Sequence, residues 1–232
     1  MLKLDLHVHT IFSGDALTRP GEAVLWAKRA GLSGLAITDH DSLRGAEAVM
    51  RLARGTGLLV IPGLEVESSG GHVLALGVSG PVRSGMSLAE TVEAIGEAGG
   101  VSVLAHPFAL FAPRKWSPEA LMALDAIEVV NAREILFEFS RWIARRLASS
   151  FRKPMTGGSD AHSPEVIGMA YTLVEADSSV DDVLEAIRKG KTEPRGRRVP
   201  LRYLVKRWAS VGLSASRSSS PSLALLPPEL LV

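Results

Sequence analysis

The sequence contains no cysteine and no apolar run near the roughly 20 residues that span a bilayer. The lack of cysteine excludes disulfide bonds and thiolate ligands, so any metal must be held by nitrogen and oxygen. The lack of a long apolar run excludes a membrane-spanning helix. A histidine of a candidate motif stands already at position 7, which argues against a cleaved leader. We therefore expect a cytoplasmic protein without membrane contact.

Length and charge divide the chain unequally. Its 232 residues fit one large domain, or one domain with an appendage. Residues 1–187 hold 16 Lys+Arg against 23 Asp+Glu, a net charge of −7, and residues 188–232 hold 10 against 2, a net charge of +8. Residues 214–222 are also rich in serine. We expect a domain over 1–194, followed by a basic extension and a disordered tail over 195–232.

Strand and helix patterns alternate along the first part of the chain. The strand patterns cover 2–8, 34–38, 58–66, 72–78, 101–105, 126–130 and 171–174, with a further one leading from 153–156 into a glycine pair. The helix patterns cover 20–30, 42–54, 87–98, 118–124, 134–151 and 180–189. About seven β/α units predict an α/β barrel one unit short of (β/α)₈, or an open doubly wound sheet. Polar motifs recur at strand ends, which favours the barrel because its strand ends converge on one mouth.

All six histidines stand in or beside short clusters of the kind that bind metals. His7 and His9 lie two apart on one strand and so share a face, as a ligand pair or as a surface pair. His40 stands between Asp39 and Asp41, although Asp41 or Ser42 could simply cap the following helix. Glu65 ends an apolar run, where it either bridges cations or pairs with an arginine.

The later histidines vary in how much they indicate. His106 precedes Pro107 at a strand end and is either a ligand or a packed core residue, and His72 alone is a single histidine in a hairpin. The segment Gly157-Gly-Ser-Asp160-Ala-His162 is the strongest local signal. Its glycines permit a tight turn, and Asp160 and His162 project from the same side of an extended segment.

Taken together, these motifs resemble those of the polymerase-and-histidinol-phosphatase (PHP) phosphoesterases over roughly residues 1–194. The matching segments, in order, are Asp5-Leu-His7-Val-His9-Thr, Ile37-Thr-Asp-His40-Asp, Gly63-Leu-Glu65, His72-Val-Leu-Ala-Leu-Gly, Leu104-Ala-His106-Pro and Gly158-Ser-Asp160-Ala-His162. The resemblance implies a distorted (β/α)₇ barrel with two or three divalent metal ions at its mouth and hydrolysis of phosphate esters.

The resemblance also implies a ligand set. His7, His9 and Asp160 would hold one ion, Glu65 would bridge it to a second held by His72 and His106, and His40, His162 and Asp15 would hold a third. Glu65 and Asp160 are the expected catalytic residues. Nitrogen and oxygen ligands suit manganese, zinc or iron, and such ions would make a bridging water into hydroxide near neutral pH.

Phosphate recognition requires cations besides the metals. Arg133 and Asn131, at another strand end, are the expected substrate-binding residues, since an arginine can grip a phosphate through two hydrogen bonds. Alternatively Arg133 flanks a helix and pairs with Glu134 or Glu138. Arg114 and Lys115 are second candidates, or else a solvated loop tip.

These features favour a metal-dependent hydrolase of phosphomonoesters, acting on small molecules or on nucleotide ends. The basic extension could bind nucleic acid, or it could be a solubilising tail. One alternative is a PHP-like scaffold for RNA or protein with little or no turnover. Another is a hydrolase of C–N bonds, but no lysine stands at a ligand-bearing strand end to bridge two metals.

Overall fold

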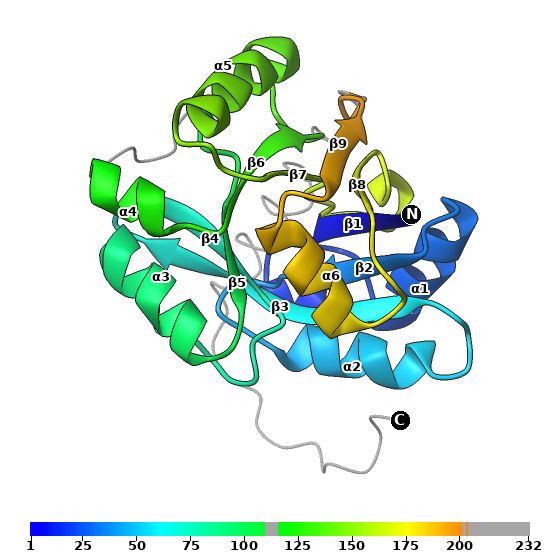
Figure 1. The fold of residues 1–232 in the computed structure, drawn as a ribbon. Coiled ribbons are helices and arrows are strands. Elements are labelled where there is room, and N and C mark those ends of the chain that lie inside the picture. Colours follow the sequence, from blue (N-terminus) through cyan, green and yellow to red (C-terminus); the bar gives the residue numbers. More distant parts are fainter. Residues whose placement is uncertain (110–115, 201–202, 204–232) are drawn as a thin grey trace, which may run out of the picture.

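Nine strands form one sheet that curls into a nearly closed barrel in the computed structural model, which describes residues 1–109, 116–200 and 203 (Figure 1). The strands β1 to β9 are Leu2–Val8, Gly34–Ile37, Leu59–Ser68, Gly71–Leu76, Val101–Leu104, Ala126–Asn131, Met155–Gly158, Ala170–Val174 and Thr192–Gly196. The helices α1 to α6 are Pro20–Arg29, Arg44–Ala53, Leu88–Glu97, Pro118–Ala123, Phe137–Ser150 and Val180–Arg188. Two short 3-10 helices, η1 and η2, cover Ile11–Ser13 and Pro164–Val166.

The strand order confirms the expected barrel and adds antiparallel members to it. The order is β7-β6-β5-β4-β3-β2-β1-β8-β9. β1, β2 and β3 are parallel neighbours, and so are β5, β6 and β7. β4 is antiparallel to β3, as the expected hairpin requires, and it is also antiparallel to β5. β8 is antiparallel to both β1 and β9. The barrel is therefore a distorted relative of the all-parallel form.

Side-chain hydrogen bonds and two glycines bring β7 against the opposite end of the sheet. Thr172 of β8 both donates to the Gly157 carbonyl and accepts from the Gly157 amide, each at 2.8 Å. Thr192 of β9 donates to the Met155 carbonyl at 2.8 Å. A Cβ at Gly158 would lie 2.4 Å from the Cβ of His7, so only glycine permits this approach of β7 to β1.

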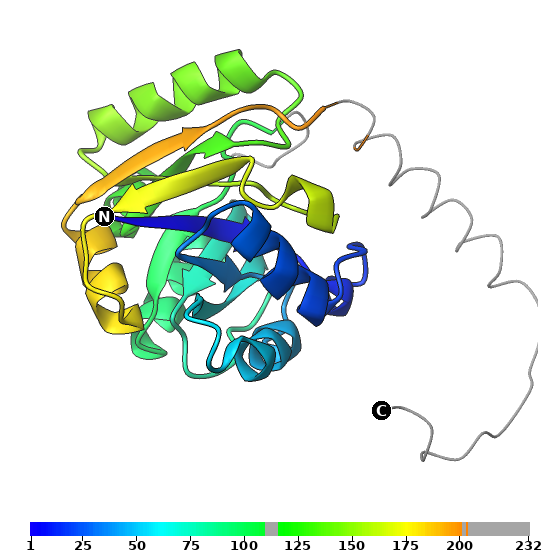
Figure 2. The same ribbon diagram turned by 90° about the vertical axis from the view of Figure 1, so that its right-hand side faces the viewer.

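The end of the barrel at which β1 begins is filled with aliphatic side chains and covered by α6 (Figure 2). Val183, Leu184 and Ile187 of α6 belong to the same buried cluster as the inward-facing residues of the strands. Those strand residues include Leu4, Leu6, Ile61, Leu74, Leu76 and Val103. Figure 2 shows α6 at the end where the first strand begins, opposite the carboxyl ends of the parallel strands. The apolar core closes one end, so polar chemistry is confined to the other.

An irregularity in β1 turns its histidines toward that open end. The pairing register of β1 with β2 shifts between Asp5 and Val8. Successive residues of a regular strand face opposite sides, yet Leu6 joins the interior cluster and His7 contacts Glu65 inside the mouth. Such a bulge lets two neighbouring residues face the same side.

The sheet continues beyond residue 194, where we expected the barrel domain to end. β9 reaches Gly196, and the buried Val199 donates its amide to the Ala132 carbonyl at 2.7 Å. The Ser-rich stretch at 214–222 lies outside the described residues. Within the described part of the chain, no helix is long and apolar enough to cross a membrane.

Candidate metal centre

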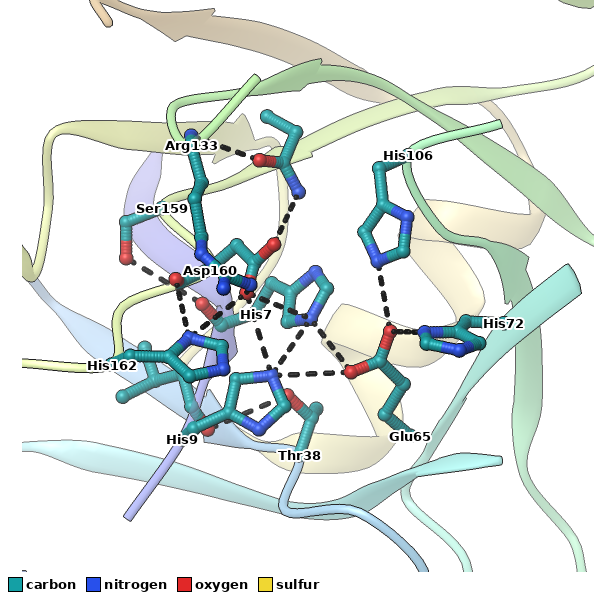
Figure 3. A network of polar contacts seen from close by, with 12 residues as sticks. His7, His9, Thr38, Glu65, His72, His106, Arg133, Ser159, Asp160 and His162 are labelled. Carbon is teal, nitrogen blue, oxygen red and sulfur yellow. Dashed lines mark hydrogen bonds and ion pairs between the residues drawn. The ribbon is translucent and has the colours of Figure 1, made fainter. Parts of the chain in front are cut away.

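The nine side chains expected as metal ligands meet at the mouth of the barrel, where the parallel strands end. Figure 3 shows His7, His9, Glu65, His72, His106, Asp160 and His162 of this set. Their donor atoms form four groups that share members, and within each group all donor atoms lie within 4.8 Å of one another. The groups are His7, His9 and Asp160; His7, Glu65 and His106; His40, Glu65 and His72; and His9, Asp15, His40 and His162. Asp15 and His72 therefore lie together with the other seven side chains.

Glu65 of β3 is the centre of this arrangement. Its side chain is 2% exposed. Five ring nitrogens surround its two oxygens, at 2.8 Å (His72), 2.9 Å (His106), 3.2 Å (His9), 3.3 Å (His7) and 3.4 Å (His40). Burial alone would raise the pKa of Glu65, but the charge of His7 and the hydrogen bond with His106 hold it well below its ordinary value. Among the described residues, the ion-pair partners of Glu65 are histidines and not the arginine that the sequence left open.

His7, His9 and Asp160 form one of the four groups of donor atoms. The Nε2 atoms of His7 and His9 are 3.1 Å apart, and Asp160 Oδ1 lies 3.8 Å and 3.6 Å from them. The outer ring nitrogens are engaged elsewhere, that of His7 with Glu128 at 3.1 Å and that of His9 with Ser13 at 2.9 Å. Those contacts turn both Nε2 atoms inward, toward the same space.

Asp15 and His162 belong to another of the four groups, together with His9 and His40. Asp15 lies in the segment that follows η1. His162 Nε2 lies 3.0 Å from Asp15 Oδ2, and His40 Nε2 lies 3.8 Å from the same oxygen. Burial would raise the pKa of Asp15, but the contact with His162 lowers it to about 2. Burial would lower the pKa of His162, but Asp15 and Asp160 raise it to about 9.

The donor set fits divalent cations. Two imidazole nitrogens 3.1 Å apart repel when both present lone pairs or both carry protons, so they need one proton or one cation between them. Protons take up part of this role in the metal-free protein. Burial and the charge of His162 lower the pKa of His9 to about 3, whereas contact with Glu65 overcomes burial and raises the pKa of His106 to about 9. Ion binding would therefore displace protons.

The two oxygens of Glu65 face different histidines. Its Oε1 contacts His72 and His106, and its Oε2 contacts His7, His9 and His40. His9 belongs to two sets, those of Asp160 and of Asp15. The helix-capping alternative for Asp41 does not hold, because α2 has Leu43 at its N-cap and no side-chain capping bond.

Arg133 points into the mouth. Its Nη1 lies 3.5 Å from Asp160 Oδ1, and its side chain is 31% exposed. The alternative pairing with the helix acids does not occur: Glu138 pairs with Arg141 at 2.7 Å, and Glu134 accepts from Ser140 at 3.3 Å. Arg133 thus offers its remaining N–H groups at the edge of the centre.

Asn131, expected to bind substrate, is engaged within the protein. Its amide nitrogen donates to Glu128 at 2.9 Å and to Asp160 at 3.3 Å, and its oxygen accepts from the Arg133 amide at 2.9 Å. Only 5% of Asn131 is exposed. Arg114 and Lys115 lie outside the described residues.

Three further buried carboxylates, to which the sequence assigns no role, lie around the centre. Glu128 contacts His7 at 3.1 Å. Asp5 accepts hydrogen bonds from Ser159 and Gly168 at 2.6–2.8 Å, although burial raises its pKa to about 6. Asp39 accepts from the hydroxyl of Thr10 at 2.7 Å. A carboxylate inside an apolar strand pattern was the available signal for Asp5 and Glu128, since such a group is retained only with partners.

Comparison with known proteins agrees with this geometry. A family model described as PHP-associated matches residues 140–192. An uncharacterized protein of Methanocaldococcus jannaschii is 31% identical over 141 residues, which are 56% of this chain and 82% of that protein. With its barrel and its ordered motifs, the chain belongs to the PHP family.

Two further relatives are described by an activity. The crystal structure of a Bacteroides vulgatus two-domain protein, said to contain a predicted PHP-like metal-dependent phosphoesterase, superposes with a TM-score of 0.72 at 25% identity. The match covers 84% of this chain and 65% of that one. A 5′-3′ exoribonuclease of Haemophilus influenzae is 35% identical over 78 residues, which are 32% of this chain and 28% of that enzyme.

Proposed function

We propose that this protein is a divalent-metal-dependent phosphoesterase that hydrolyses phosphomonoesters. The observation that carries the proposal is the convergence of nine nitrogen and oxygen donors around the buried Glu65. So many donors exceed the four to six that one ion takes, which favours two or three ions. The relatives described as a phosphoesterase and an exoribonuclease support hydrolysis of phosphate esters.

The protein's residues would divide the work between them. When bound, manganese, zinc or iron would polarise the ester, supply hydroxide near neutral pH and stabilise the departing oxygen. Glu65, which contacts His7, His40 and His106, would keep neighbouring cations together by neutralising their charge. Asp160 would bind one of them and orient Arg133, whose guanidinium would hold a phosphate oxygen. These assignments make Glu65 and Asp160 the proposed catalytic residues.

The other candidate functions lack an observation in their favour. A binding scaffold has no need for six histidines and three carboxylates held at ligand distances. A C–N hydrolase that bridges its metals through a carbamylated lysine would need a lysine at the mouth. Among the described residues, Lys3, Lys28 and Lys153 donate instead to the backbone carbonyls of Ala30, Thr56 and Met122.

The test is phosphate release from a panel of substrates by protein loaded with Mn²⁺ or Zn²⁺. The panel contains p-nitrophenyl phosphate, nucleoside monophosphates and a 5′-phosphorylated oligonucleotide, with an amide and a carboxylate ester as controls. We expect phosphate release that a chelator abolishes and that metal restores. Hydrolysis of the amide alone, or no turnover of any phosphate ester after loading, contradicts the proposal.

A further inference from the structure

Glu128, on β6, is a buried carboxylate at the centre that is not one of the nine donors. It is 1% exposed. Its Oε1 lies 3.1 Å from His7 Nδ1, and its Oε2 accepts from the His106 amide and from the Asn131 side chain, both at 2.9 Å. We propose that Glu128 is the positioning residue of the metal centre, which fixes the ring of His7 and the backbone of His106. The inference rests on the proposed function.

The first effect is on the ring of His7. A carboxylate only accepts hydrogen bonds, so the ring nitrogen that faces it carries the proton. The lone pair of His7 then lies on Nε2, the atom that faces His9 at 3.1 Å and Glu65 at 3.3 Å. Second ring nitrogens of metal-binding histidines commonly meet such an acceptor, which fixes the tautomer and strengthens the ligand.

The second effect is on the backbone at two proposed ligands. His106 has φ +25° and Asp160 has φ +51°, in the left-handed region that side-chain-bearing residues seldom adopt. Glu128 accepts the His106 amide directly. It reaches Asp160 through Asn131, whose amide group donates to both carboxylates. One side chain therefore supports ligands on both sides of Glu65.

The surroundings of Glu128 are built around this contact. Within the described part of the chain, His7 is its only ion-pair partner. A Cβ at Gly158 would lie 3.0 Å from Glu128 Oε1 and 2.4 Å from His7 Cβ, so glycine leaves the space in which these two residues meet. A buried carboxylate without lysine or arginine costs stability. Two of the three donors to Glu128 belong to the proposed ligands His7 and His106, and the third, Asn131, also donates to Asp160.

The test is Glu128→Gln, compared with Glu193→Gln, the same substitution at an exposed position of β9. Three donors face two atoms of Glu128, and a glutamine offers an acceptor at only one of them. We expect the dissociation constant for Zn²⁺, measured by competition with a chelator, to rise about 10–100-fold. In the zinc-loaded protein, the His7 Nδ1 proton should also lose its downfield ¹H shift in NMR spectra. The control should match the wild type in both.

Unchanged zinc affinity together with an unchanged His7 Nδ1 proton overturns the inference. If Glu128→Gln does not fold, Glu128→Asp replaces it, because aspartate keeps the charge but is too short to reach both His7 and His106. Wild-type zinc affinity in a folded Glu128→Asp protein is likewise incompatible with the positioning role. Neither measurement requires turnover, so a protein that binds zinc and hydrolyses nothing refutes the proposed function and leaves this inference standing.

Discussion

Glu65→Gln replaces the central carboxylate by an amide of the same shape. In the structure that carboxylate contacts five ring nitrogens at 2.8–3.4 Å and is 2% exposed. Removing one partner of a buried ion pair costs about 3–5 kcal/mol. In the metal-free protein the histidines can shed protons instead, so we expect a loss at the lower end, about 3 kcal/mol of unfolding free energy at pH 7. With metal present, an amide neutralises no cation, and we expect turnover to fall at least 100-fold, about 2.7 kcal/mol.

Two measurements separate these effects. Urea unfolding with a chelator gives the loss of stability, and phosphate release at saturating Mn²⁺ gives the loss of turnover. Glu67→Gln is the matched control, because Glu67 is an exposed residue of the same strand. An unchanged turnover number at saturating metal, in a folded Glu65→Gln protein, would falsify the central role of Glu65.

The purified protein should hold two or three divalent ions per chain after loading with Mn²⁺ or Zn²⁺, and elemental analysis that finds at most one contradicts the centre. Arg133→Ala should raise KM for phosphate esters without lowering metal content, unlike the helix-surface control Arg141→Ala; equal catalytic efficiency in the two variants excludes phosphate binding by Arg133. His106 and His162 have pKa values of about 9, above the 6.5 of the unfolded chain, so their contribution to metal-free stability is complete below pH 6.5 and is lost as the pH rises through about 9. Urea unfolding with a chelator should show a fall on the order of 3 kcal/mol for each of these two histidines between pH 6.5 and 9.5, and a flat or rising profile disagrees with protonated histidines in the metal-free protein. Truncation after Tyr203, which keeps β9 and the buried Val199, should leave small phosphomonoesters unaffected, and a selective, salt-sensitive loss on an oligonucleotide would assign the basic extension to nucleic-acid binding.

The sequence was sufficient for the barrel and for the set of residues that meet at its mouth. Strand and helix patterns alternate with different periods, and the histidine motifs follow the strands, so their convergence depends only on the strand ends meeting. The hairpin of β3 and β4 was also predictable, because a serine and glycine turn separates two strand patterns.

What the sequence could not show depends on contacts between distant residues. The bulge in β1 is set by pairing with β2, and β9 forms only because β8 offers an edge to a polar, proline-containing segment. The contact between Glu128 and His7 spans 121 residues, and that between Asp5 and Ser159 spans 154. The local sequence pattern cannot predict which distant residue an acid contacts. A single acid in an apolar strand indicates only that some partner exists.

The distance along the chain between His7 and Asp160 also constrains how the protein is made. β1 carries His7, and His9 follows it directly, so both donors are synthesised well before Ala161, to which Val8 is bridged. Loop closure over so many residues is slow, and a chain that waits for it exposes its apolar strands. A nascent chain therefore cannot assemble the group of His7, His9 and Asp160 before Asp160 has been synthesised, and binding of a metal by all three residues must follow closure of the barrel.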